Sequence, residues 1–280
     1  MTTIDINKKR RCQTIMKKKF IIGSIVTAVV LAAFFTMIFF MKLSKDNLDK
    51  ELASFKDSLT KSMSGYESDS PMSIEVFTRS SGFTILGGKN YLDFEITADR
   101  TNTSSEHSNY EYAEFLRKKC VEALSGDGTN KIKRNLNNHS AIIVRIRAMN
   151  KEYPSIKDNL DLSFRNSFTD IGNGGRNESF DPFSDKLFDK VFIQNNQNYL
   201  DMNDILNFSE VSGLAVENIN EIDISEYEFD RFVNLKLLHI TDFFSTDPDA
   251  ENKIKSQLPD DCEFETGWNM KETIDSIGNY

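Results

Sequence analysis

The stretch from Phe232 to Phe243, FVNLKLLHITDF, decides the predicted fold. Its apolar residues follow neither the period of a helix nor the simple alternation of a half-buried strand. Instead, Leu235, Leu238 and Ile240 are spaced by three and then by two positions. This spacing is typical of a short strand whose alternate side chains face a core, and it raises the question of whether the pattern recurs.

The same spacing recurs in two earlier segments, FDKVFI at residues 188–193 and VSGLAV at residues 211–216. The middle positions of the three segments are Val191, Leu214 and Leu238, at intervals of 23 and 24 residues. A fixed interval of this length is the signature of stacked repeats, each of which can bury its apolar face only against its neighbours. The spacing therefore predicts parallel rungs, with a further rung near Cys262 and an earlier one near Leu160.

Residues from about 156 to 266 resemble a short, degenerate leucine-rich-repeat array. The segment FDKVFIQNN, residues 188–196, matches the family's LxxLxLxxN strand best, with Asn196 at the asparagine position. The sequence departs from the family at Ile219 and Phe243, which replace that asparagine. We therefore expect a repeat-like domain over residues 151–280, and a mixed-sheet domain is the alternative.

The resemblance implies a function, because such arrays present a concave parallel sheet that binds proteins or other ligands. The strand residues expected to point outward include Ala215 and five candidate partner-binding residues: Phe192, Gln194, Glu217, His239 and Thr241. The alternative is that these are ordinary exposed strand residues.

A second strong pattern lies near the start of the chain, where residues 20–41 contain no charged side chain. A helix of 22 residues is about 33 Å long, and the hydrocarbon core of a membrane is ~30 Å thick. We expect a retained transmembrane helix here, because the run is longer than the core of a signal peptide and lacks a small-residue cleavage site. Seven basic residues in the preceding tail, residues 1–19, predict a cytoplasmic N-terminus and a single-pass protein of the plasma (inner) membrane with an extracytoplasmic body.

The charge of the body limits its partners. Subtracting the seven basic residues and one acid before residue 42 from the totals of 34 and 43 leaves 27 basic and 42 acidic residues, a formal charge of −15. A surface of this sign repels polyphosphates, so no nucleic-acid partner is expected.

Between the apolar run and the repeats, two segments are expected. Residues 42–71 show Leu and Phe at helical spacing, which predicts a stalk or a helix packed on the following domain, with a short dimer coil as the sharper alternative. Residues 72–150 predict a small α+β unit with strands near 72–78, 91–97 and 141–148. Its helix begins after Ser108 or Asn109 and stops at Gly126.

No catalytic chemistry emerges from the sequence. The three cysteines and three histidines are scattered, so no metal site and no cofactor are predicted. The fold expected is α+β: a transmembrane helix, a stalk helix, the small α+β unit and the repeat-like solenoid. The function expected is binding of a protein or ligand. The alternative is an envelope enzyme or accessory factor with its site in residues 72–150.

Overall fold

The computed structural model describes residues 3–64, 66, 70–81, 89–102, 107–148, 159–167, 180–194, 202–216, 228–240 and 247–266. Side chains are described for these residues except 3–25, 28, 41, 44, 80, 81, 89, 90 and 194. The chain divides into two compact units, Met1–Lys50 and Glu51–Tyr280, and each is described by itself.

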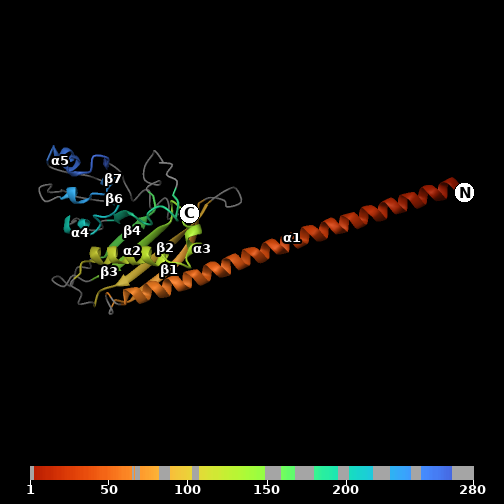
Figure 1. The fold of residues 1–280 in the computed structure, drawn as a ribbon, viewed down its shortest axis with the longest axis horizontal. Helices are drawn as coiled ribbons and strands as arrows, with labels where there is room; N and C mark the ends of the chain where they lie inside the picture. Colours follow the sequence, from red (N-terminus) through yellow and green to blue (C-terminus); the bar gives the residue numbers. More distant parts are fainter. Residues whose placement is uncertain are drawn as a thin grey trace. The chain divides into compact units, whose positions relative to one another are not determined.

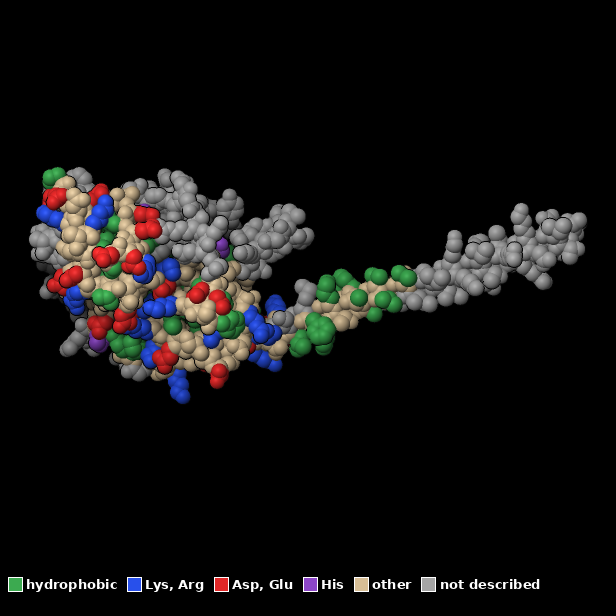
Figure 2. Space-filling model, turned by 45° about the horizontal axis from the view of Figure 1, so that its top comes forward, with side chains coloured by type: hydrophobic (Ala, Val, Ile, Leu, Met, Phe, Trp, Pro, Cys, Tyr) green, Lys and Arg blue, Asp and Glu red, His purple; other side chains and the backbone are tan. Residues whose placement is uncertain are grey.

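The first unit consists of helix α1, which begins at Thr3 and continues into the second unit as far as Met63. Hydrophobic side chains between Val26 and Phe40 are exposed along it, as Figure 2 shows. In the described part of the chain, no helix is both long enough and apolar enough to cross a membrane. The prediction of a transmembrane helix over residues 20–41 is therefore wrong. Helix α1 instead continues without a break from this run into a charged segment.

The last turns of α1 belong to the second unit and pack on its sheet. Phe55, Leu59 and Met63 are buried on one face, as their helical spacing predicts. The ring of Phe55 meets the ring of Phe94 edge to face at 5.2 Å between centroids. Residues 51–63 thus form a helix packed on the following domain, one of the three possibilities for residues 42–71.

The second unit is built on one sheet of eight strands, which lie side by side in chain order (Figure 1). The strands are β1 (Met72–Ser81), β2 (Lys89–Asp99), β3 (Ala141–Arg147), β4 (Leu160–Arg165), β5 (Lys190–Gln194), β6 (Gly213–Val216), β7 (Leu237–Ile240) and β8 (Glu263–Thr266). The pairs β1–β2, β3–β4 and β4–β5 are antiparallel, and β2–β3 is parallel. From β5 to β8 all neighbours are parallel.

Helices occupy the crossovers that parallel neighbours require. The connection from β2 to β3 contains α2 (Asn109–Ser125) and α3 (Asn130–Asn135). The later connections contain α4 (Met202–Leu206), the 3-10 helix η3 (Phe229–Arg231) and α5 (Ala250–Gln257). Helix α2 lies against β3 and β4 and provides one wall of the site described below (Figure 1).

Helix α2 forms where its sequence predicts it. The side chain of Ser108 accepts a hydrogen bond from the main-chain N–H of Glu111, which caps the helix, and Gly126 follows its last residue. Ala113, Leu116, Cys120 and Leu124, which recur at helical spacing, are fully buried on one face of α2. Cys120 is thus a core residue, and burial raises the pKa of its thiol far above the usual range.

The positions that defined the repeat are aligned in the sheet. Val191 pairs with Leu214, Leu214 with Leu238, and Leu238 with Phe264. The prediction of a small α+β unit followed by a separate leucine-rich-repeat-like solenoid is nevertheless wrong. Strand β4 bonds to β3 on one edge and to β5 on the other, so the backbone hydrogen bonds join both segments into one mixed sheet.

Candidate functional site

The residues predicted to bind a partner do not form an exposed surface where the structure describes them. Phe192 is 3% exposed and His239 is 0% exposed, and both are aligned with the buried Ala215. The side chain of Gln194, and both Glu217 and Thr241, lie outside the described residues. The two residues that are described therefore belong to the core.

The burial of these two residues has a general cause. Parallel strands are usually covered on both faces, so their sequences are continuously apolar instead of alternating. The strands GLAV (213–216) and LLHI (237–240) are buried at every position. This unbroken apolar pattern is the sequence signal for strands buried on both faces, and it argues against the prediction that Phe192 and His239 point outward.

On strands β1, β2 and β3, charged residues of the same sheet face as Phe192 and His239 pair with one another. Arg145 of β3 forms an ion pair with Glu95 of β2. Arg79 of β1 lies 2.7 Å from the carboxylate of Asp93. Asp93 is 2% exposed, and burial raises its pKa to about 6, against the opposing effect of Arg79. In each of these two ion pairs the acidic and the basic side chain compensate each other's charge.

A pocket of about 690 Å³ lies between α2, α3 and the segment that leads into β5. Ligand sites typically have volumes of about 300–1,000 Å³, so this pocket is large enough for a small organic molecule. Its lining carries three basic and three acidic residues: Arg117, Lys133, Lys186, Asp185, Asp189 and Glu210. Phe183, Val121 and Ser125 are among its other lining residues.

Arg117 is a buried residue of the pocket wall. Its guanidinium donates two hydrogen bonds to the carboxylate of Glu114, at 2.7 and 2.6 Å, in the forked geometry that is strongest for this pair. Burial disfavours the charge, but the hydrogen bonds to Glu114 and the nearby acidic charges outweigh the effect of burial and leave the pKa of Arg117 above its usual value. The charge of Arg117 is thus fully compensated inside the protein.

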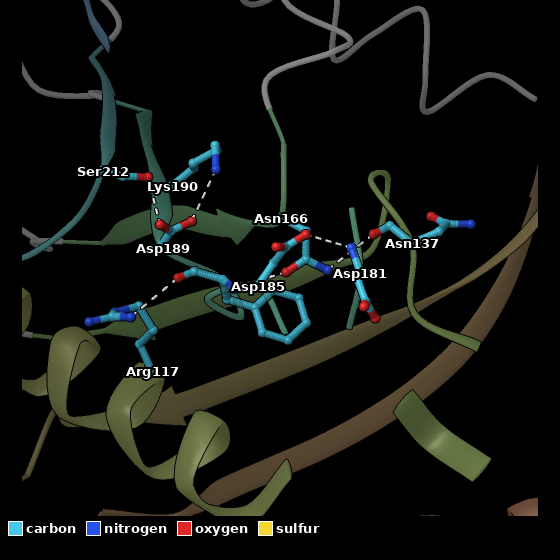
Figure 3. A network of polar contacts seen from close by, with 9 residues as sticks. Arg117, Asn137, Asn166, Asp181, Asp185, Asp189, Lys190 and Ser212 are labelled. Atoms are coloured by element: carbon cyan, nitrogen blue, oxygen red, sulfur yellow. Dashed lines mark hydrogen bonds and ion pairs between the residues drawn. The ribbon is translucent and has the colours of Figure 1, made fainter. Parts of the chain in front are cut away.

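Arg117 also holds the residue that precedes Asp189. Its Nη1 donates to the main-chain carbonyl of Phe188 at 3.3 Å, and the N–H of Phe188 donates to the side chain of Asn166 at 2.9 Å. Phe188 has a φ of 51°, in the left-handed region that a bulky residue rarely adopts. Such a conformation costs ~1–3 kcal/mol and persists only where its surroundings fix it. Figure 3 shows Arg117 and Asn166 converging on this part of the wall.

Asp189 fixes the start of β5 to the start of β6. Its carboxylate accepts hydrogen bonds from the hydroxyl of Ser212 at 2.6 Å and from the ammonium of Lys190 at 3.1 Å (Figure 3). The carbonyl of Asp189 accepts the N–H of Ser212 at 2.9 Å. Two of the pocket's charges, those of Arg117 and Asp189, therefore have structural roles.

The outer wall of the pocket is a turn that is bonded within itself. The carboxylate of Asp181 accepts the N–H of Phe183 at 3.0 Å and the hydroxyl of Ser184 at 2.9 Å, and the pKa of Asp181 falls as a result. The carboxylate of Asp185 accepts the N–H of Asp181 at 2.5 Å. This turn presents the ring of Phe183 at the surface, where it is 56% exposed.

Helix α3 places Lys133 on the other side of the pocket. The carboxylate of Glu51, in α1, accepts the N–H groups of Lys131 and Ile132 at 2.7 and 3.1 Å. The Glu51 carboxylate thus satisfies two main-chain donors at the start of α3, where the side chain of the N-cap residue Thr129 makes no capping hydrogen bond. The Lys133 ammonium lies 6.0 Å from the centre of the Phe183 ring.

The sequence did not predict this pocket, because its walls come from segments around 117–133, 182–189, 210 and 234 that show no shared motif. Within the described residues, no group of three or more His, Cys, Asp or Glu residues is arranged to hold a metal ion. The fold and the site together define an α+β protein with a mixed sheet and a charged surface pocket. No family model, no curated protein and no solved structure matches the chain. The resemblance to leucine-rich repeats stays a prediction.

Proposed function

We propose that the protein is a binding protein whose ligand occupies the pocket between α2, α3 and residues 182–189. The observation that carries this proposal is the pocket's volume of about 690 Å³, with walls held by buried side-chain bonds to the main chain. A pocket whose shape is fixed in advance loses little conformational entropy when a ligand binds, which favours affinity.

The bonds around Phe188 support a binding role, because strained residues persist where the protein needs a defined shape. Arg117 bonds to the main-chain carbonyl of Phe188, and Asn166 bonds to its main-chain N–H. The alternative of an enzyme with its site in residues 72–150 has less support. Cys120, the cysteine of that segment, is fully buried and its thiol has a raised pKa, so it does not suit nucleophilic chemistry.

A fragment screen by crystal soaking of the full chain tests the proposal, with neutral, cationic and anionic fragments in equal number. We expect bound fragments to cluster in the pocket. The variant Ser125→Trp places a large side chain on the pocket wall and should abolish this binding.

Ser256→Trp is the matched control. Both serines are exposed near the end of a helix, and each bonds back to a main-chain carbonyl of its own helix at 2.7 Å. Ser256 is not part of the pocket lining. Fragments that bind elsewhere, or that still occupy the pocket region in Ser125→Trp, would contradict the proposal.

A further inference from the structure

The charges of the pocket differ in whether a side chain of opposite charge already neutralises them. Two of the three acidic groups are neutralised by lysines that do not line the pocket: Glu210 lies 3.0 Å from Lys118, and Asp189 accepts bonds from Ser212 and Lys190. The hydrogen bond from Lys118 lowers the pKa of Glu210, and Lys186 contributes to the same shift. Asp185 accepts a main-chain N–H in the outer turn. Arg117 is neutralised by Glu114.

Two cations remain. In the part of the chain that the structure describes, neither Lys133 nor Lys186 has a carboxylate within ion-pair distance. The Lys133 ammonium makes one long hydrogen bond, 3.5 Å, to the carbonyl of Ser125. The absence of an acid partner is notable, because acidic residues outnumber basic ones by 42 to 27 after residue 41. Set against the one carboxylate of Asp185, which accepts a main-chain N–H, the two lysines leave the pocket with a net positive charge for a ligand.

An aromatic ring lies beside this charge. Phe183 is 56% exposed and lines the pocket, and the ammonium of Lys133 is 6.0 Å from its centre. A ring in this position offers an apolar face to a ligand while the two lysines attract an anionic group. The arrangement fits a molecule that is anionic at one end and flat or apolar at the other.

We propose, on the basis of the binding function above, that the pocket binds a small organic anion, with its carboxylate or phosphate between Lys133 and Lys186 and its apolar part against Phe183. The bound anion would supply the negative charge that no described carboxylate places within ion-pair distance of these lysines. Because both ammonium groups remain near the surface, each contact contributes modestly and weakens as salt rises.

The test uses four probes that share one ring: benzoate, phenyl phosphate, neutral benzamide and cationic benzylamine. Binding to the full chain is followed by amide chemical-shift changes in NMR spectra. We expect the two anions to shift the amides of residues 125, 133, 183 and 186. Their affinity should exceed that of the neutral and cationic probes by roughly tenfold or more. The comparison of benzoate with phenyl phosphate shows which anion the lysines prefer.

The double variant Lys133→Met, Lys186→Met should weaken anion binding roughly tenfold and leave any benzamide binding unchanged. The matched control is Lys255→Met. The Lys255 ammonium lies 5.7 Å from the centre of the Phe264 ring, similar to the 6.0 Å between Lys133 and Phe183. Unlike Lys133, Lys255 is paired with an acid, Glu251, and it does not line the pocket. We expect the control to bind the anions as the unchanged protein does.

The outcomes separate the two proposals. If benzamide or benzylamine occupies the pocket as tightly as benzoate, the pocket binds ligands but the anion proposal is wrong. The same holds if the double lysine variant retains full affinity for both anions. If no fragment of any charge enters the pocket, the proposed function itself fails.

Discussion

The guanidinium of Arg117 donates a hydrogen bond to the main-chain carbonyl of Phe188, 71 positions later in the chain. This bond joins the middle of α2 to the entry of β5, where the backbone of Phe188 is left-handed. The same guanidinium is neutralised by Glu114 in its own helix. One side chain thereby links the helical layer, the parallel half of the sheet and the wall of the pocket.

Replacing Arg117 by methionine should be strongly destabilising. The buried carboxylate of Glu114 would lose its forked partner, and breaking a buried ion pair from one side costs about 3–5 kcal/mol. We expect the free energy of unfolding, measured by urea denaturation, to fall by this amount. Lys119→Met removes the comparable but exposed pair with Glu122 and should cost less than about 1 kcal/mol. Equal losses in the two variants would contradict the role of Arg117.

Asn166→Ala should lower stability through the pocket wall. Asn166 is buried, accepts the N–H of Phe188 at 2.9 Å and donates to the carbonyl of Asn137 at 3.1 Å. Leaving these buried groups unsatisfied costs about 1–3 kcal/mol in urea denaturation. Asn135→Ala is the control, since its side chain is exposed and bonds only within its own helix turn at 2.8 Å. A loss no larger than the control's would show that Phe188 holds its conformation without Asn166.

Leu214→Ala tests the aligned positions of the parallel strands. Leu214 is fully buried between Val191 and Leu238, and removal of a buried leucine side chain costs about 2–5 kcal/mol. Thermal unfolding should show a clear fall in the midpoint. Val233→Ala, at a position that is 75% exposed, should change the stability by no more than about 0.5 kcal/mol. If Leu214→Ala and Val233→Ala unfold at the same midpoint temperature, the alignment of these strands is incorrect.

Asp93 should make stability fall as pH rises. Burial raises its pKa to about 6, so the folded protein retains a proton at this carboxyl that the unfolded chain loses near pH 4. Its contribution is fully present below about pH 4 and is lost as the pH rises to about 6. Asp93→Asn should remove this slope from a series of urea denaturations between pH 4 and 7. The exposed Asp230→Asn should leave the slope as it is.

His239 should make stability fall as the pH is lowered, the opposite of the effect of Asp93. Burial lowers its pKa, although Glu265, at 3.4 Å from Nδ1, partly offsets the shift. The unfolded chain therefore takes up a proton near pH 6.5 that the folded protein does not. The contribution of His239 is present above that pH and is lost as the pH falls further. In His239→Gln the loss of stability below pH 6.5 should become smaller. A pH profile identical to that of the unchanged protein would mean that this histidine is accessible to protons in the fold.

Parts of this structure follow from short-range sequence patterns. Ser108 and Gly126 bound α2 because capping and termination depend on neighbouring residues. The interval from Val191 to Leu214 to Leu238 anticipated which residues pair in the parallel strands. The same spacing did not show that β4 joins these strands to the first half of the sheet, because strand pairing across a long connection leaves no local pattern. Nor did it show that Phe192 and His239 are buried.

The sequence by itself determined the helix that packs its Phe55 face on the sheet, the core face of α2 and the register of the repeated strands. Each of these depends on periodic burial within a single element, which side-chain spacing expresses directly. Only the tertiary structure decided that one mixed sheet unites the two halves and that a charged pocket forms beside α2. Its contacts join residues far apart in the chain, Arg117 to Phe188 across 71 positions and Glu51 to Lys131 across 80. Among the described residues, the same long-range packing decides that Lys133 and Lys186 have no acid partner, since neighbouring residues in the sequence do not specify which charges meet in the folded protein.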